Sequence, residues 1–296
     1  MLPIAMVVGV FCHNVIDAVA GLAPVLIFVM LLITFCKIEF RQFHITAMTW
    51  WLLGVQILGS VAAYFALLPV NPVLAQGAFI CIFCPTATAA PVITAMLGGS
   101  IQRLVTYSLV SNAVVAATAP MLFTMMGGDV GFMESTVTIA AKVLPLILGP
   151  LAVAILLKHT VPGVHRVLAQ KQGISFYIWA LSLIIVVGRA VSFMLKEPAD
   201  CIPLMIALAA ISLIVCGIQF IIGRRIGARF GDKIAGAQGL GQKNTVLAIW
   251  MAIAYLNPIA SVAPAAYVAW QNIINSTQIY YKMRATSAAV THNAGK

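Results

Sequence analysis

The chain has 296 residues, of which 62% are hydrophobic and 8% are charged, and its mean hydropathy is +1.05. A soluble domain carries about 25% charged residues, so these values exclude a soluble globular protein. The net charge of +10 is explained by basic loops on one side of a membrane and does not call for a nucleic-acid partner. Unbroken apolar runs, in place of the alternation seen in barrel strands, predict an all-α polytopic membrane protein.

About ten apolar segments are candidates for membrane helices, since a span takes about 20 residues. In chain order they are Leu2–Ile16, Gly21–Cys36, Ile45–Leu68, Val73–Gly98, Ile101–Met126, Thr136–Lys158, Gly173–Met194, Cys201–Ile222, Ile234–Leu256 and Ala260–Tyr281. The first is short, and it lacks the basic region and cleavage site of a signal peptide, so we interpret it as a membrane helix.

The basic residues fall in alternate loops, which sets the expected orientation. One set of loops and the tail hold Lys37, Arg41, Arg103, Lys158, Arg166, Lys171, Arg224, Arg225, Arg229, Lys233, Lys282, Arg284 and Lys296. The other set holds most of the acidic residues and a single basic residue, Lys196. We therefore expect both termini in the cytoplasm, with residues 283–296 as a cytoplasmic tail.

Ten spans divide into two repeats of five, about 1–126 and 136–282, and an odd-numbered repeat is inverted in its second copy. The fourth span is interrupted at CPTATAAPV, which contains Pro85 and Pro91. The ninth is interrupted at GAQGLGQKNT, which contains Gly239 and Gly241. Proline removes a backbone donor, and paired interruptions at matching positions point to a binding site at the middle of the membrane.

No catalytic set is present. The seven acidic residues map to loops or span ends, and the chain has no nucleotide-binding or protease motif. We therefore expect neither an enzyme nor a cofactor. Cys81 and Cys84 form a C-x-x-C pair, but no second pair or histidine follows at ligand spacing, so we interpret them as small buried hydrophobes and expect no metal site.

Polar side chains nevertheless gather in the predicted membrane interior. They are Gln56, Thr86, Thr88, Thr94, Ser108, Ser111, Asn112, Gln242, Lys243, Asn244, Thr245, Gln271 and Asn272. Hydroxyls often bond to their own helix, and amides often join helices. Lys243 differs because a cation in mid-bilayer costs about 2.5–3.5 kcal/mol. It either marks a functional site, with backbone carbonyls or an anion as its partner, or caps the C-terminus of a half-helix.

Four stretches make the chain resemble the bile acid:sodium symporter family over nearly its whole length: FCPTATAAPV, VLPLILGPLAVAILL, GLGQKNTVLA and VAWQNIINS. The resemblance implies ten helices in two inverted repeats, with helices 1, 2, 6 and 7 as a panel and helices 3–5 and 8–10 as a core. It also implies crossing broken helices 4 and 9, sodium-driven transport of organic anions such as bile acids or pantoate-like acids, and a bacterial inner membrane.

The positions that the resemblance assigns to sodium are largely changed. The family's Ser-Asn pair falls on Ala90-Pro91, its fifth-helix serine on Leu104, and its ninth-helix glutamate on Gly239, or on Gln238 if the alignment shifts by one. A glutamine of the family falls on Lys243. Gln56 is kept, and Ser108 retains a second hydroxyl. The substrate-side positions are better kept, namely Thr88, Asn244, Gln271 and Asn272.

We therefore expect a secondary transporter of a small organic anion that is sodium-independent or proton-coupled. Two cations about 4 Å apart repel by roughly 4 kcal/mol at an effective dielectric of 20, so a charged Lys243 excludes a neighbouring sodium. Lys243 is then one of two things. It is a fixed charge that stabilises the crossover, the point where the two broken helices cross, or it is a proton carrier, since burial disfavours its charged form. Two alternatives stay open: facilitated diffusion without ion coupling, and a non-transporting membrane sensor or scaffold. The expected partners are the organic anion, membrane lipid and protons.

Overall fold

The computed structural model describes Val8, Phe11 and residues 19–36, 43–127, 132–170 and 172–294. The first expected span, Leu2–Ile16, lies outside the described residues except at Val8 and Phe11. The helices, in chain order, are η1 Ala20–Leu22, α3 Ala23–Phe35, α4 Ala47–Leu67, α5 Pro72–Phe83, α6 Ala90–Leu97, α7 Ile101–Gly127, α8 Phe132–Thr160, α9 Pro162–Gln170, α10 Gln172–Lys196, η3 Ala199–Cys201, α11 Ile202–Arg229, α12 Lys233–Gly241, α13 Thr245–Tyr255, η4 Pro258–Ser261 and α14 Val262–Ala294.

Every other expected segment corresponds to one helix or to a broken pair, and the differences lie at the ends. The helix α11 continues to Arg229 and does not stop at Ile222, so Arg224 and Arg225 lie on its last turns and not in a loop. The short helix α9 was not expected from the sequence. The helix α14 continues through the segment expected as a tail, as far as Ala294.

Several helices have the length and composition of membrane spans. Four long apolar segments qualify: Ala47–Leu67, Ile101–Met126, Met133–Thr160 and Ala199–Arg229. Three shorter apolar helices, Ala23–Phe35, Pro72–Phe83 and Thr245–Tyr255, accompany them. With helices as the only regular elements apart from one isolated bridge in the described part of the chain, the fold is that of an all-α membrane protein.

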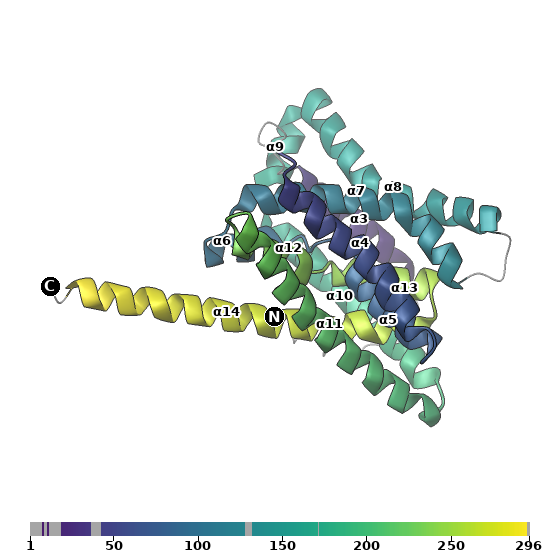
Figure 1. The fold of residues 1–296 in the computed structure, drawn as a ribbon. Helices are drawn as coiled ribbons and strands as arrows, with labels where there is room; N and C mark the ends of the chain where they lie inside the picture. Colours follow the sequence, from purple (N-terminus) through teal and green to yellow (C-terminus); the bar gives the residue numbers. More distant parts are fainter. Residues whose placement is uncertain are drawn as a thin grey trace.

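The packing of the helices places α5, α12 and α13 in the interior of the molecule. The helix α3 packs against α8 and α10, whereas α4, α5, α11, α12 and α14 form a second group, and α7 contacts both α4 and α8. Figure 1 shows this bundle, with the C-terminal half of α14 projecting away from the other helices.

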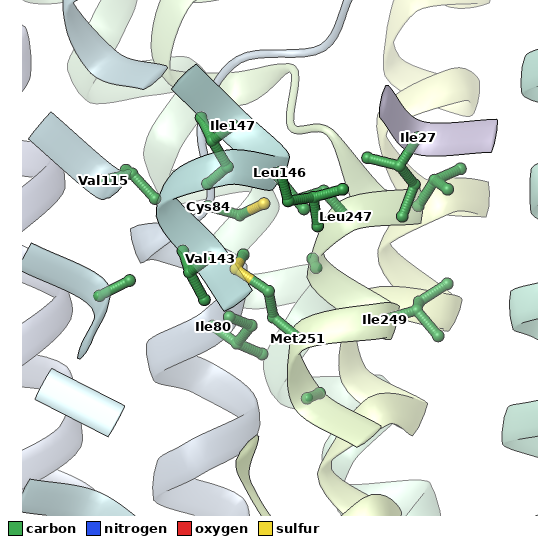
Figure 2. Close-up of a cluster of buried hydrophobic side chains, with 14 of the residues drawn as sticks. Ile27, Ile80, Cys84, Val115, Val143, Leu146, Ile147, Leu247, Ile249 and Met251 are labelled. Atoms are coloured by element: carbon green, nitrogen blue, oxygen red, sulfur yellow. The ribbon is translucent and has the colours of Figure 1, made fainter. Parts of the chain in front are cut away.

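The largest apolar cluster covers one side of the interior. Val143, Leu146 and Ile147 of α8 lie over Cys84 at the end of α5 and over Leu247 of α13 (Figure 2). All five side chains are buried. This cluster keeps one side of the point where α5 and α13 meet free of polar groups.

The helices α11 and α12 form a close pair joined by a tight turn. A Cβ atom added to Gly236 of α12 would lie 2.2 Å from the carbonyl oxygen of Gly223 and 2.7 Å from the Cα of Gly227, both in α11. The backbones can approach this closely only because these residues lack side chains. Asp232 begins α12 by accepting from the N–H of Ala235 at 2.8 Å, and it also accepts from the N–H of Ser100 at 2.8 Å.

Candidate functional site

The site is built where two helices are interrupted. The helix α5 ends at Phe83 and α6 begins at Ala90, with Pro85 in the link and Pro91 in the first turn of α6. Because proline has no N–H and crowds the preceding turn, one continuous helix across both prolines is unfavourable. The helix α12 ends at Gly241, and α13 begins at Thr245.

The two links pair with each other as a short antiparallel bridge between Thr86 and Lys243. The N–H of Ala87 donates to the carbonyl of Gln242 at 2.9 Å, and the N–H of Asn244 donates to the carbonyl of Pro85 at 2.8 Å. The hydroxyl of Thr86 also donates to the carbonyl of Gly239 at 2.9 Å. The prediction that both helices are discontinuous and that their breaks meet is confirmed.

Consecutive carbonyls at the end of α5 each accept from another helix or link. Gln219 of α11 donates to the carbonyl of Cys81 at 3.2 Å, and Lys243 Nζ donates to that of Ile82 at 2.8 Å. Gln56 of α4 donates to the carbonyls of Phe83 at 2.7 Å and Cys84 at 3.1 Å. These are the carbonyls that a helix end leaves without partners, and in a membrane interior they require donors from the protein.

Lys243 is the charged residue of this group, and its side chain is 1% exposed. Its ammonium lies at the C-terminal end of α5, where the helix dipole favours a cation. Its backbone N–H donates to Gln271 Oε1 of α14 at 2.9 Å. The ammonium therefore bonds to a carbonyl in the last turn of a half-helix, which fits both sequence-based interpretations: a functional lysine with a carbonyl partner, and a lysine that caps the C-terminus of a half-helix.

Gln56 is the centre of a second polar group, formed with α7. Its Oε1 accepts from the hydroxyl of Tyr107 at 2.6 Å and from that of Ser111 at 2.8 Å. Ser108, the hydroxyl chosen from the sequence, is only partly buried, and its backbone carbonyl accepts from Asn112. The serine hydroxyl that reaches Gln56 is thus that of Ser111, about one turn further along α7.

The predicted substrate-side residues divide into two groups. Asn244 caps α13 by accepting from the N–H of Leu247 at 3.2 Å, and its Nδ2 is buried without a partner. Gln271 contacts the break through Lys243, and Thr88 lies half-buried in the first link. Asn272, by contrast, donates to the carbonyl of Val268 in its own helix at 2.5 Å. Asn244 and Gln271 therefore both lie at the break, whereas Asn272 bonds to its own helix.

The positions that the sequence resemblance assigns to sodium ligands offer little side-chain oxygen. Leu104 is fully buried in an apolar cluster with Leu52 and Ala90. A Cβ atom on Gly239 would lie 3.0 Å from the ring of Tyr107, so this ring occupies the space that a larger side chain would need. Gln238 turns toward α14, where it donates to Asn275 at 3.1 Å.

Sequence reasoning missed three polar side chains of the site: Gln219, Tyr107 and Tyr267. The hydroxyl of Tyr267 accepts from Gln219 at 3.0 Å and donates to the carbonyl of Gly241 at 2.8 Å. Gln219 could have been found, because a glutamine inside an apolar run requires a partner there. The tyrosines gave no such signal, since their rings are apolar. Cys81 and Cys84 are free and buried, and the described residues contain no group of three or more metal-binding side chains.

The sequence matches no protein-family model, and a search of characterised proteins also finds no match. The class of protein is therefore defined by the fold and the site themselves: an all-α membrane protein with two interrupted helices whose breaks pair in its interior.

Proposed function

We propose that this protein is a secondary transporter of a small organic anion in which Lys243 takes the place of a coupling sodium ion. The observation that carries the proposal is the antiparallel Thr86–Lys243 bridge, which joins two interrupted helices and buries a lysine between them. Interrupted helices that cross near mid-membrane are a common way for secondary transporters to build a binding site.

An anion is favoured by the potential at the crossover. The helices α6 and α13 begin there, and their N-termini carry partial positive charge and free N–H groups. The C-termini of α5 and α12 lie at the same point and offset much of this partial charge, so the net positive charge comes from the buried Lys243. Asn244 Nδ2 and Gln242 Oε1 are buried polar atoms without partners in this structure, and they are the atoms available to a polar ligand.

Sodium coupling is disfavoured by the same geometry. Sodium bound at a broken helix needs several oxygen ligands, and the carbonyl of Ile82 already accepts from the Lys243 ammonium. Gln56 Oε1 accepts from two hydroxyls. The positions of Leu104 and Gly239 supply no side-chain oxygen. These contacts support the proposal that Lys243 replaces the ion that the resemblance implies.

The test is uptake of a panel of radiolabelled small organic acids into proteoliposomes, with sodium and pH gradients varied independently. We expect uptake of at least one organic anion, with no dependence on the sodium gradient. Stimulation by a sodium gradient at constant pH would contradict the assigned role of Lys243. Absence of uptake for every acid would favour a non-transporting sensor or scaffold.

Lys243→Gln separates the two roles of the lysine, with Lys233→Gln at the exposed start of α12 as the matched control. If Lys243 carries protons, the substitution removes the response of uptake to the pH gradient while substrate still binds. If Lys243 is a fixed charge, uptake falls at every pH. The control variant is expected to behave as the unchanged protein does.

A further inference from the structure

One face of α14 is polar along most of the length that packs inside the protein. It carries Tyr267, Gln271, Asn275, Gln278 and Lys282. The spacing of three or four residues places these side chains above one another on a single face of a helix. We call this row the α14 polar row.

The α14 polar row faces the interrupted helices. The first two residues of the row contact the crossover: Tyr267 donates to the carbonyl of Gly241, and Gln271 accepts from the N–H of Lys243. Further along, Gln238 of α12 donates to Asn275 Oδ1 and to Gln278 Oε1, both at 3.1 Å. The row therefore continues from the crossover along the surface of α12.

The far end of the α14 polar row reaches the end of α6 and the α11–α12 turn, a region we call the basic face because Lys282, Lys233 and Arg103 lie there. A Cβ atom added to Gly98, at the end of α6, would lie 3.9 Å from Lys282 Nζ. Gly98 is followed closely by Ser100, whose N–H donates to Asp232 in the α11–α12 turn. Burial decreases in the same direction, because Asn275 is 3% exposed, Gln278 is half-buried and Lys282 is exposed.

Two polar atoms have no partner where Gln238 of α12 meets the middle of this row. Gln238 is 0% exposed, yet its Oε1 accepts no hydrogen bond, and Asn275 Nδ2 donates none. Buried polar groups are almost always satisfied, and in a membrane interior lipid cannot supply the missing bonds. Water is the usual partner of such groups, and it makes about three hydrogen bonds in such a place.

We propose that water molecules occupy the α14 polar row between Gln271 and Lys282 and connect the crossover to the basic face. The ligand class is water, because Gln238 Oε1 needs a donor and Asn275 Nδ2 needs an acceptor, and a carboxylate anion could only accept. This row lies where α14 packs against α6 and where Gln238 of α12 bonds to Asn275 and Gln278. Its use as a supply of protons to Lys243 rests on the proposed function, whereas the hydration itself does not.

The competing explanation is that the amides only hold α12 and α14 together, as interhelical amides commonly do in membranes. Both explanations include the same hydrogen bonds between the amides, but only the proposal places water molecules beside them. A thiol reacts with a hydrophilic methanethiosulfonate reagent only as the thiolate, which forms in water and not in hydrocarbon. Reactivity of introduced cysteines therefore separates them.

The experiment introduces Asn275→Cys and Gln238→Cys, with Ile273→Cys as the matched control. Ile273 lies on the opposite face of α14 and is 56% exposed, so in the membrane it faces lipid. Each variant, in lipid nanodiscs, is treated with a small charged methanethiosulfonate, and adducts beyond those of the unchanged protein are counted by intact-mass spectrometry. We expect one added adduct for Asn275→Cys and for Gln238→Cys, and none for Ile273→Cys.

Failure of Asn275→Cys and Gln238→Cys to react more than Ile273→Cys, in variants that keep the thermal unfolding transition of the unchanged protein, would overturn the proposal. If Asn275→Cys does not fold, Gln238→Cys tests the same row from the facing helix. Modification without any anion uptake would keep the hydrated row and remove the transport function. Anion uptake without modification of the introduced cysteines would support the transport function and contradict the hydrated row.

Discussion

At the scale of single residues, the interior of this protein is organised by donors that satisfy backbone carbonyls. Lys243, Gln56 and Gln219 come from three different helices or links, and together they donate to the carbonyls of residues 81–84. A carbonyl left without a donor in a membrane interior is costly. The interruption of α5 is therefore stable only because distant parts of the chain supply these donors.

Gln56→Leu is expected to destabilise the protein by about 1–3 kcal/mol or more, because two carbonyls and two hydroxyls each lose their hydrogen bond to Gln56. The affected groups are the carbonyls of Phe83 and Cys84 and the hydroxyls of Tyr107 and Ser111. The measurement is reversible unfolding in mixed micelles. Leu58→Ala, on an exposed position of the same helix, is the control with little change expected. Equal stability of the two variants would contradict the role assigned to Gln56.

At the scale of elements, α11 and α12 behave as one unit. Three glycines allow their backbones to touch, and the Asp232 carboxylate fixes the turn between them. The same carboxylate accepts from Ser100 at the start of α7, and Arg103 of α7 donates to the carbonyl of Phe230. The half-helix α12 is thus held at its outer end by packing and at its inner end by the bridge to Thr86.

Gly236→Ala is expected to destabilise the protein strongly, at or above the upper end of the 1–3 kcal/mol typical of overpacking. The added methyl group would meet backbone atoms of Gly223 and Gly227, which cannot move aside as a side chain can. Gly217→Ala in α11 is the matched control, since an added Cβ there meets nothing within 4 Å. The control is expected to be neutral or to stabilise by up to about 1 kcal/mol through helix propensity. Similar unfolding free energies for both variants would refute the close packing.

At the scale of the whole molecule, basic residues of α7, α12 and α14 lie in one region, the basic face. Arg103 contacts the α11–α12 turn, and Lys282 lies beside Gly98. Segments distant in sequence therefore place their basic residues together, which is the arrangement expected of a cytoplasmic face.

A reporter fused to the C-terminus tests this orientation. We expect a fluorescent protein, which folds in the cytoplasm, to be bright there, and alkaline phosphatase, which needs export, to be inactive. A phosphatase fusion placed after Lys196, between α10 and η3, is the matched control and is expected to be active. The opposite pattern would show that the basic face lies outside.

The sequence by itself determined that the protein lies in a membrane, that it is helical, and where two of its helices are interrupted. These are local properties: hydropathy selects the membrane, and prolines and glycines break helices wherever the fold places them. The positions of Pro85, Pro91, Gly239 and Gly241 were therefore sufficient to predict two broken helices. The ten-span inverted repeat, the substrate and the coupling ion remain proposals.

Only the tertiary structure decided which polar groups meet. Ser108 and Ser111 are one helical turn apart, and the sequence offered no reason to prefer the one that reaches Gln56. The carbonyl that receives the Lys243 ammonium belongs to a residue far from it in the chain, and no local pattern encodes such a pair. Likewise, Gln238 contacts Asn275 only because close glycine packing sets the position of α12. Side-chain partners depend on the register and rotation of packed helices, and these follow from the packing of the whole chain and not from any single segment.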